Sequence, residues 1–269
     1  MESRGKSTLS LLLITAIGLG VGLLLGLTGI GSGSVLTPLL ILAGGLTPAK
    51  AVGTSLAFAF VTKIVASISF YRRGLVDFAI LKKFLPGAAA GVLLSFFLLE
   101  GLRVRSPQMQ SLFLQRAIGV ALLAVFALMA ARLFPNTAGH VLVERMTGFA
   151  QHHERKLAFA VGFAVGLSVT LTSIGAGAAL IPMLYLLYRP DSGRLIGTSI
   201  FFGTILSAAA GFLHAGQGDI DLRVVAALLL GSLPAIWLAS HLHGRLPRLA
   251  SEAIIAGAIL LLGVRLFFR

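Results

Sequence analysis

The sequence predicts an all-α polytopic membrane protein made of two homologous helical repeats, each with about four full-length transmembrane helices plus one short broken or re-entrant helix. Composition is the first reason: 57% of the 269 residues are hydrophobic and 12% are charged, whereas a soluble domain is about half apolar and about one quarter charged. The second reason is the length of the apolar runs, because a helix needs about 20 mostly apolar residues to cross a bilayer. The third is an internal repeat. Together these observations exclude a soluble enzyme, a disordered chain and a fibrous protein.

The first half contains four long apolar segments and one short segment. A basic flank precedes the first segment, as in a signal peptide, but the apolar run continues without a clear cleavage point, so we expect a retained helix. The short segment follows a glycine-rich turn. In chain order the expected segments are Thr8–Ile30, Ser34–Leu42, Ala51–Tyr71, Phe78–Leu99 and Leu112–Phe134.

The second half has the same order of long and short segments. A polar stretch precedes it, so we expect an N-terminal transmembrane repeat at residues 1–134, a polar linker at 135–156 and a C-terminal transmembrane repeat at 157–269. The expected segments are Leu157–Ile174, Ala178–Leu187, Leu195–His214, Leu222–Leu242 and Ala250–Phe268.

The two halves align without gaps at an offset of 144 residues. A glycine-rich turn, a proline, a Gly-Thr-Ser pattern and a Gly-x-x-Asp pattern all match in one register, which indicates a duplication. Matched pairs include Gly18 with Gly162, Thr28 with Thr172, Pro38 with Pro182, Gly53 with Gly197 and Asp77 with Asp221.

Duplicated halves are a common architecture of secondary transporters, whose substrate site lies between the halves near the membrane midplane. With five crossings in each half, Lys and Arg divide 12 against 9 between the two sides, and with four crossings they divide 13 against 8. This difference does not distinguish inverted from parallel repeats. One local observation favours inversion: the loop at Tyr71–Lys83 carries four basic residues, whereas its repeat partner at Ala215–Arg223 carries two aspartates and one arginine.

Each half contains a glycine-rich break between a long apolar segment and the short one. Irregular backbone is tolerated inside a bilayer only where protein or water covers it, so the paired breaks indicate a cavity. The N-terminus of each following short helix would direct N–H groups and a partial positive charge into that cavity, which favours an anion. Close helix packing through small residues is the alternative explanation. The substrate-binding candidates from the breaks are Thr28, Gly31, Ser32, Gly33, Ser34, Thr172, Ser173, Gly175 and Gly177.

Further candidates lie on two long segments. Lys63 lies about twelve residues into its segment, near mid-membrane, where a lysine costs at least ~2.5 kcal/mol and needs a partner or a watered cavity. We expect Lys63 to bind the anion or to couple protons, and a snorkelling structural lysine is the alternative. The other candidates are the hydroxyls of Thr54, Ser55, Thr198 and Ser199. A hydroxyl near the start of a membrane helix serves either a site or a neighbouring backbone group.

His214 is the second candidate for proton coupling, because histidine changes charge near physiological pH. A histidine at an interfacial helix end is more often a solvated cap. Asp77 and Asp221 open loop-to-helix transitions and are expected to be N-caps. We expect no metal site, no catalytic set and no cofactor, since the chain has no cysteine and no recognisable nucleophile–base arrangement. The formal charge of +13 is expected to reflect basic loops and not nucleic-acid binding.

Ordered and duplicated motifs resemble those of the TauE/SafE sulfite exporter family of membrane permeases. The motifs that carry the resemblance are the turn before Pro38, Ala51–Leu56, Thr62-Lys63, Tyr71–Asp77, Gly197–Ser199, His214, Gly218–Asp221 and Leu230–Pro234. The resemblance covers nearly the whole chain outside the linker. It implies a multi-pass permease of the bacterial cytoplasmic (inner) membrane that moves sulfite, sulfonates or other small sulfur-containing or organic anions.

We therefore expect a secondary transporter of a small anion that works by alternating access and is driven by an ion gradient, with a proton as the coupling ion. An anion channel is one alternative, and it would pass current without saturation. A non-transporting membrane partner protein is another, and it would not be stabilised by small anions. The sequence leaves the substrate, the transport direction and the oligomeric state open.

Overall fold

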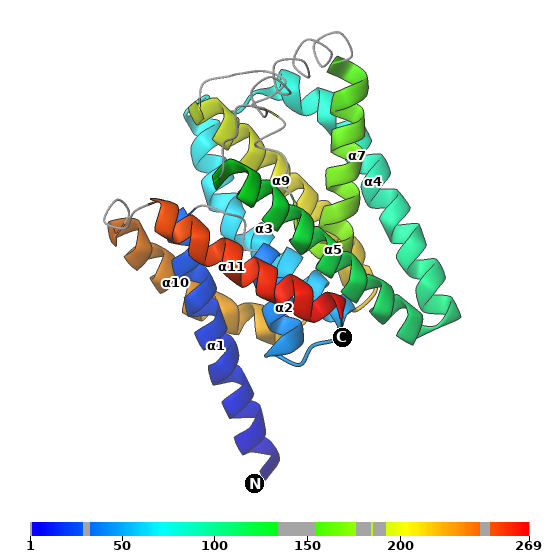
Figure 1. Cartoon of the computed structure of the whole chain (residues 1–269), viewed down its shortest axis with the longest axis vertical. Coiled ribbons are helices and arrows are strands. Elements are labelled where there is room, and N and C mark those ends of the chain that lie inside the picture. The colour runs from blue at the N-terminus through cyan, green and yellow to red at the C-terminus, as the bar shows by residue number, and fades with distance from the viewer. Residues whose placement is uncertain are drawn as a thin grey trace.

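A computed structural model of the chain describes residues 2–28, 33–133, 154–175, 184, 192–242 and 248–268. This part of the chain holds nine α-helices and no strand, which confirms the all-α prediction (Figure 1). Six of these helices are long and apolar enough to cross a membrane. The helices are α1 (Glu2–Thr28), α2 (Gly33–Leu42), α3 (Pro48–Arg72), α4 (Phe78–Arg105), α5 (Pro107–Leu133), α7 (Glu154–Thr172), α9 (Ser192–Gly216), α10 (Leu222–Leu242) and α11 (Arg248–Phe267).

Local chemistry sets several helix boundaries. Asp77 precedes α4, and its Oδ1 accepts the N–H groups of the second and third helical residues at 2.9 and 3.2 Å. Asp221 does the same for α10 at 3.0 and 3.2 Å. Both N-cap predictions are confirmed. The predicted end of α4 at Leu99 is too early, because the residues that follow it stay helical as far as Arg105. The predicted start of α5 at Leu112 is too late, since the helix begins at Pro107.

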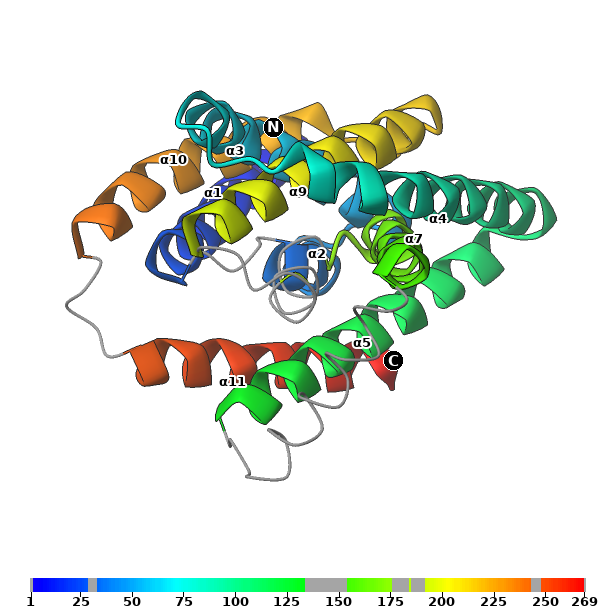
Figure 2. The ribbon, with the colours of Figure 1, turned by 90° about the horizontal axis from the view of Figure 1, so that it is seen from above.

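Four helix pairs surround a central short helix. α3 packs on α9, α5 on α11, α1 on α10 and α4 on α7. Seen from above, the α3–α9 and α5–α11 pairs lie on opposite sides of the bundle, the other two pairs close its flanks, and α2 lies in the middle (Figure 2). All residues of α2 except Leu39 and Leu42 are buried. A broken helix in this position is enclosed by protein, as an irregular backbone inside a bilayer requires.

The contacts between helices recur with the offset of 144 residues. Gly18 of α1 lies against the backbone of Leu228, and its repeat partner Gly162 lies against the backbone of Phe84. A Cβ at either glycine would approach a backbone oxygen at van der Waals overlap, so the missing side chain is what lets the helices touch. The same relation holds for Gly22 with Gly166 and for Gly87 with Gly231. These glycines therefore allow close packing between the helices.

The repeat-related helices α3 and α9 run antiparallel. Leu56 of α3 lies beside Gly211, whereas Ser67 shares a hydrogen bond of 2.6 Å with the hydroxyl of Thr204. Residue numbers therefore fall along α9 as they rise along α3. The contacts of α5 with α11 follow the same rule. Corresponding helices that run in opposite directions are the mark of inverted-topology repeats. The predicted boundaries between repeats and linker stay predictions, since residues 134–153 lie outside the described part.

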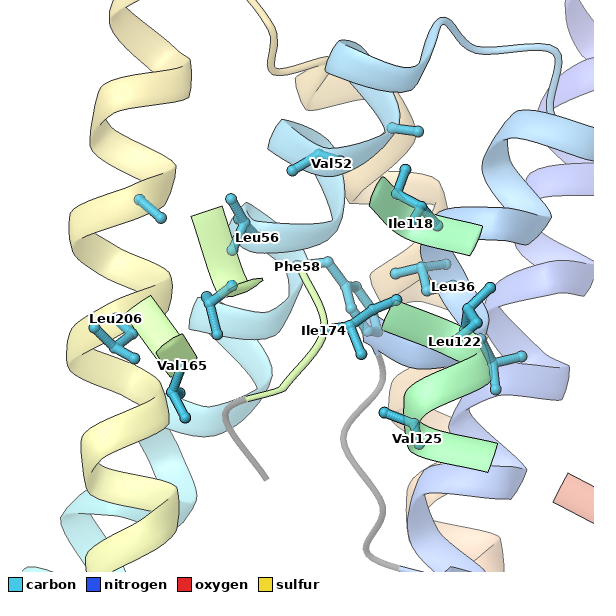
Figure 3. Close-up of a cluster of buried hydrophobic side chains, with 14 of the residues drawn as sticks. Leu36, Val52, Leu56, Phe58, Ile118, Leu122, Val125, Val165, Ile174 and Leu206 are labelled. Atoms are coloured by element: carbon cyan, nitrogen blue, oxygen red, sulfur yellow. The ribbon is translucent and has the colours of Figure 1, made fainter. Parts of the chain in front are cut away.

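One apolar cluster brings the central elements to the same level. Phe58 of α3 lies beside Leu36 of α2 and beside Ile174, which follows α7, while Ile118 and Leu122 of α5 face them (Figure 3). All five side chains are buried. The cluster therefore holds α2 and the end of α7 together in the middle of the bundle.

Candidate functional site

The two glycine-rich breaks meet in the middle of the bundle. α2 begins at Gly33 in the first half, and α7 ends at Thr172 in the second half. Gly33 lies so close to Ser173 that a Cβ on this glycine would collide with the serine carbonyl oxygen. The structure therefore brings predicted site residues of both halves into contact.

The break after α7 has an unusual backbone. Ser173 has a φ of 61°, and it is the one non-glycine residue with positive φ among those described. This conformation is unfavourable for a residue with a Cβ, and such strain concentrates at functional sites. The hydroxyl of Thr172 accepts the N–H of Ile174 at 3.1 Å, and Ser168 donates to the carbonyl of Ile174 at 2.9 Å. Side-chain hydroxyls thus form hydrogen bonds with backbone groups that the end of α7 leaves without helical partners.

Several hydroxyls near the breaks are buried without a hydrogen-bond partner in the described part of the chain. They are those of Thr37 on α2, Ser55 on α3 and Ser173, together with Ser232 on α10. A buried polar group is nearly always hydrogen-bonded, so an unpaired one calls for a water or a ligand. Gly33 contacts Ser173 directly, and Thr37 lies one turn further along the same helix. The hydroxyls of Thr37 and Ser173 could therefore serve one bound group.

Lys63 points into the bundle. At 100° per residue it lies on the side of α3 opposite to Val61, Val65 and Ile68, which are all exposed. The register of α3 against α9 places it level with Ser207, which is also its repeat partner, so Lys63 lies where the two related helices cross. The side chain is still partly accessible, and it makes no ion pair or hydrogen bond with any residue that the structure describes.

The two Gly-Thr-Ser motifs do not lie together. Thr54 accepts the N–H of Asp221 at 3.1 Å, and Thr198 accepts the N–H of Asp77 at 2.9 Å. We call these the Thr54 contact and the Thr198 contact. The first lies where α3 begins and α9 ends, the second where α3 ends and α9 begins. From Thr54 to Arg72 the helix α3 rises about 27 Å, so the two contacts belong to opposite membrane faces, which we call the Lys50 face and the Arg72 face.

Each contact includes a close approach of backbone. A Cβ at Gly53 would lie 2.5 Å from the carbonyl oxygen of Asp219, and a Cβ at its repeat partner Gly197 would collide with the carbonyl oxygen of Leu75. Both contacts join a helix of one half to the turn before a helix of the other half. They are therefore contacts between the repeats, and each seals one end of the α3–α9 pair.

His214 is not the solvated cap that an interfacial position predicts. Its side chain is buried, and its Nε2 lies 3.0 Å from the carbonyl oxygen of Thr170. Its Nδ1 lies 3.4 Å from Oδ2 of Asp219, which is also buried. The solvation prediction fails because the turn after α9 folds back over the helix end, with the N–H of Asp219 bonded to the carbonyl of His214 at 3.0 Å.

A charged groove lies next to this turn. Glu100 and Arg103 of α4, Phe212 of α9 and Gln217 of the turn line a pocket of about 590 Å³. Arg103 donates to the carbonyl of Gln217 at 2.8 Å, and the Gln217 side chain donates to Glu100 at 2.9 Å. These charges hold the outside of the turn, whereas Asp219 faces inward to His214.

The remaining predicted residues are only partly placed. Ser34 is buried at the start of α2, Gly175 has a φ of 122°, and Ser199 donates to the carbonyl of Ile196 at 2.9 Å. Gly31, Ser32 and Gly177 lie outside the described residues, as does the side chain of Thr28. No group of three His, Asp or Glu side chains gathers within the described ranges.

Sequence reasoning missed two candidates. Thr37 is a hydroxyl inside an apolar short helix, directly before Pro38, and that isolation could have marked it. Asp219 was recognised only as part of a turn motif. Its spacing of five residues from His214 crosses a helix end, so no helical periodicity links the two.

Comparisons with known proteins agree with this architecture. Residues 14–266 match the family model described as "Sulfite exporter TauE/SafE". The chain is 33% identical over 253 residues to a Bacillus subtilis (strain 168) protein named "Probable membrane transporter protein YjnA", covering 94% of this chain and 98% of that protein. It is 21% identical over 274 residues to "Probable membrane transporter protein YunE" of the same organism, covering 97% and 98%. No solved structure matches significantly. The chain therefore belongs to the TauE/SafE sulfite exporter family, and it is a multi-pass membrane transporter.

Proposed function

We propose that this protein is a secondary transporter of a small anion, and that the anion binds between Lys63 and the meeting point of the two breaks. The observation that carries the proposal is Lys63 itself: a lysine that points into a membrane bundle, stays partly accessible and makes no ion pair with a described residue. Ionisable side chains inside a membrane usually mark a substrate or ion pathway.

Polar groups at the meeting point of the two breaks suit an oxyanion. The buried hydroxyls of Ser173 and Thr37 can donate hydrogen bonds there, and Ser55, on the same helix as Lys63, has a further unpaired hydroxyl. The first turn of an α-helix favours negative charge, and α2 begins beside Ser173. Sulfite and sulfonates present several oxygen acceptors on a small head, so we propose a sulfur-containing or similar organic anion as the substrate. The other predicted residues of the breaks remain candidates for the same site.

The proposed mechanism is alternating access. Inverted halves can rock about a site near the midplane and open it to each side in turn. The antiparallel crossing of α3 and α9 at Lys63 provides such a midpoint, and the Thr54 and Thr198 contacts lie at its two ends. We propose that an ion gradient drives the cycle, with the proton as coupling ion and with Lys63 and His214 as the candidates that bind it. We place the protein in the cytoplasmic (inner) membrane.

The test is flux of labelled sulfite and sulfonates into proteoliposomes. We expect Lys63→Ala to lower the flux about tenfold or more, because a charge-assisted hydrogen bond is worth about 1.5–3 kcal/mol. Lys50→Ala is the matched control, since Lys50 is an exposed lysine of the same helix, and it should leave the flux unchanged. Unchanged flux in Lys63→Ala would contradict the proposed site. Flux that does not saturate with anion concentration would indicate a channel.

A further inference from the structure

The buried pair of His214 and Asp219 has a defined proton content. A carbonyl oxygen only accepts, so the 3.0 Å contact of Nε2 with Thr170 requires a proton on Nε2. The 3.4 Å contact of Nδ1 with Oδ2 of Asp219 is attractive only if one proton lies between these two atoms. That proton resides on either atom, giving imidazolium with carboxylate or imidazole with carboxylic acid. Without it, a lone pair on nitrogen faces a buried carboxylate. With both contacts made, the pair therefore holds two protons, and the one shared by Nδ1 and Oδ2 is the proton that it can release.

The same turn carries the Thr54 contact. The carbonyl oxygen of Asp219 lies against Gly53, and the N–H of Asp221, two residues later, is bonded to Thr54. If the carboxylate of Asp219 loses its proton-mediated bond, it is left buried without compensation, which is costly. Its route to water is movement of the turn, and this movement would pull Asp221 from Thr54.

The repeat-related positions at the other membrane face do not form such a pair. The repeat partners of His214 and Asp219 are Phe70 and Leu75, which carry no titratable group. The Thr198 contact is instead flanked by rings of Tyr71, Phe78 and Phe201, with centroids 5.7 to 6.3 Å apart. Protonation of His214 and Asp219 therefore has no counterpart at their repeat-related positions on the Arg72 face.

The other charged groups that the structure describes around the pair make no ion pair with it, although Lys50 lies one helical turn before Gly53, which contacts Asp219. Glu100 and Arg103 of α4 bond Gln217. Asp221 caps α10, where Arg223 follows it. Lys50 and Lys63 lie on α3, and the described part of α7 from residue 157 onward has no titratable side chain. Asp219 is the charged side chain in contact with His214.

We propose that His214 and Asp219 form a proton-binding switch that acts on the Lys50 face alone: the bound proton keeps the Thr54 contact closed, and its loss opens it. The inference deepens the proposed function, because it assigns the coupling proton to a pair and to one gate. By mass action, low pH favours the proton-bound state and high pH favours its loss. The Lys50 face is then closed in acid and opens in base.

The absence of native cysteines permits a direct test by single-cysteine labelling. Ser55→Cys and Ser199→Cys are near-isosteric changes at repeat-related positions that are both buried beside their threonines. In substrate-free proteoliposomes, the rate of maleimide labelling at position 55 should rise between pH 5.5 and 8 by about fivefold more than the rate at position 199. The cysteine at position 199 controls for the ordinary increase in thiolate with pH.

Substitutions of the pair should shift this readout in opposite directions. Asp219→Asn offers an amide N–H to Nδ1 at every pH, so labelling at position 55 should stay slow in acid and base. His214→Gln cannot bridge Thr170 and Asp219 together, so labelling should be fast at both pH values. Equal pH dependence at positions 55 and 199, or an unchanged dependence in Asp219→Asn, would overturn the proposal.

A second measurement covers the case in which neither cysteine reacts. The midpoint of thermal unfolding in detergent should fall for the wild-type chain from pH 5.5 to 8 by a few degrees more than for Asp219→Asn. Parallel changes in the two proteins would also overturn the switch. Neither measurement needs a substrate, so failure of the anion-flux experiment and failure of the switch can be told apart.

Discussion

The Thr54 and Thr198 contacts have the same geometry at opposite ends of the bundle. In each, a threonine near the start of a helix accepts the N–H of the aspartate that caps a helix of the other half, and a glycine beside the threonine meets a carbonyl oxygen. They differ in what surrounds them: a buried histidine and aspartate at the Lys50 face, aromatic rings at the Arg72 face. The two repeats have therefore kept the same backbone contact but differ in the side chains around it, and the proposed switch predicts that the two contacts respond differently to pH.

The largest expected effect comes from the close approach of a glycine to a backbone carbonyl, which the two contacts share. Gly53→Ala and Gly197→Ala should each lower the free energy of unfolding by about 1–3 kcal/mol, because the added methyl overlaps a backbone carbonyl that cannot move away easily. Thermal unfolding in detergent measures this loss. Gly20→Ala is the control, since nothing lies within 4 Å of that position, and it should be neutral or stabilising. A lower free energy of unfolding in only one of the two variants would show that the contacts are not equivalent.

Much of the fold was predictable because the bilayer permits few structures. Long apolar runs had to be helices, and breaks in them had to be enclosed, as α2 is. The fixed offset of 144 predicted which residues correspond. The division of charge was too even to show how the halves face each other, and the difference between the Tyr71–Lys83 and Ala215–Arg223 loops alone favoured the inverted arrangement that the structure shows. The antiparallel crossing of α3 with α9 is a property of packing, and it separates Thr54 from Thr198.

The candidate site could be predicted where a single residue carries a large energetic cost in the membrane. Lys63 was identified because a mid-membrane lysine is expensive wherever it points. The His214–Asp219 pair could not be identified in this way. It depends on a turn with Gly218 at a φ of 75° and on the carbonyl of Thr170, 44 positions away in the chain. Burial and partners of this kind arise only from the tertiary structure.

An intermediate effect should separate the two contacts by pH. Thr54→Val and Thr198→Val keep the side-chain shape and leave a partly buried N–H without its acceptor, which costs about 0.5–1.5 kcal/mol each. At pH 5.5 the two losses of unfolding free energy should be similar. At pH 8 the loss for Thr54→Val should shrink, because the proposed switch has already opened that contact, while the loss for Thr198→Val should stay constant. Denaturation of each variant at both pH values measures the difference, and equal pH dependence would argue against a one-sided switch.

The smallest expected effect tests whether the proposed opening of the Thr54 contact extends into helix α10. Asp77→Ala and Asp221→Ala remove the N-caps of α4 and α10 and should each cost about 1 kcal/mol, whereas the corresponding Asn variants should retain most of the stability, since asparagine caps equally well. The capping bonds lie within the helix that each aspartate precedes, beyond the turn that His214 holds. The cost of Asp221→Ala should therefore be the same at pH 5.5 and 8. A cost that vanished at pH 8 would mean that loss of the proton unwinds the start of α10, and the switch would then act on a helix and not only on the turn before it.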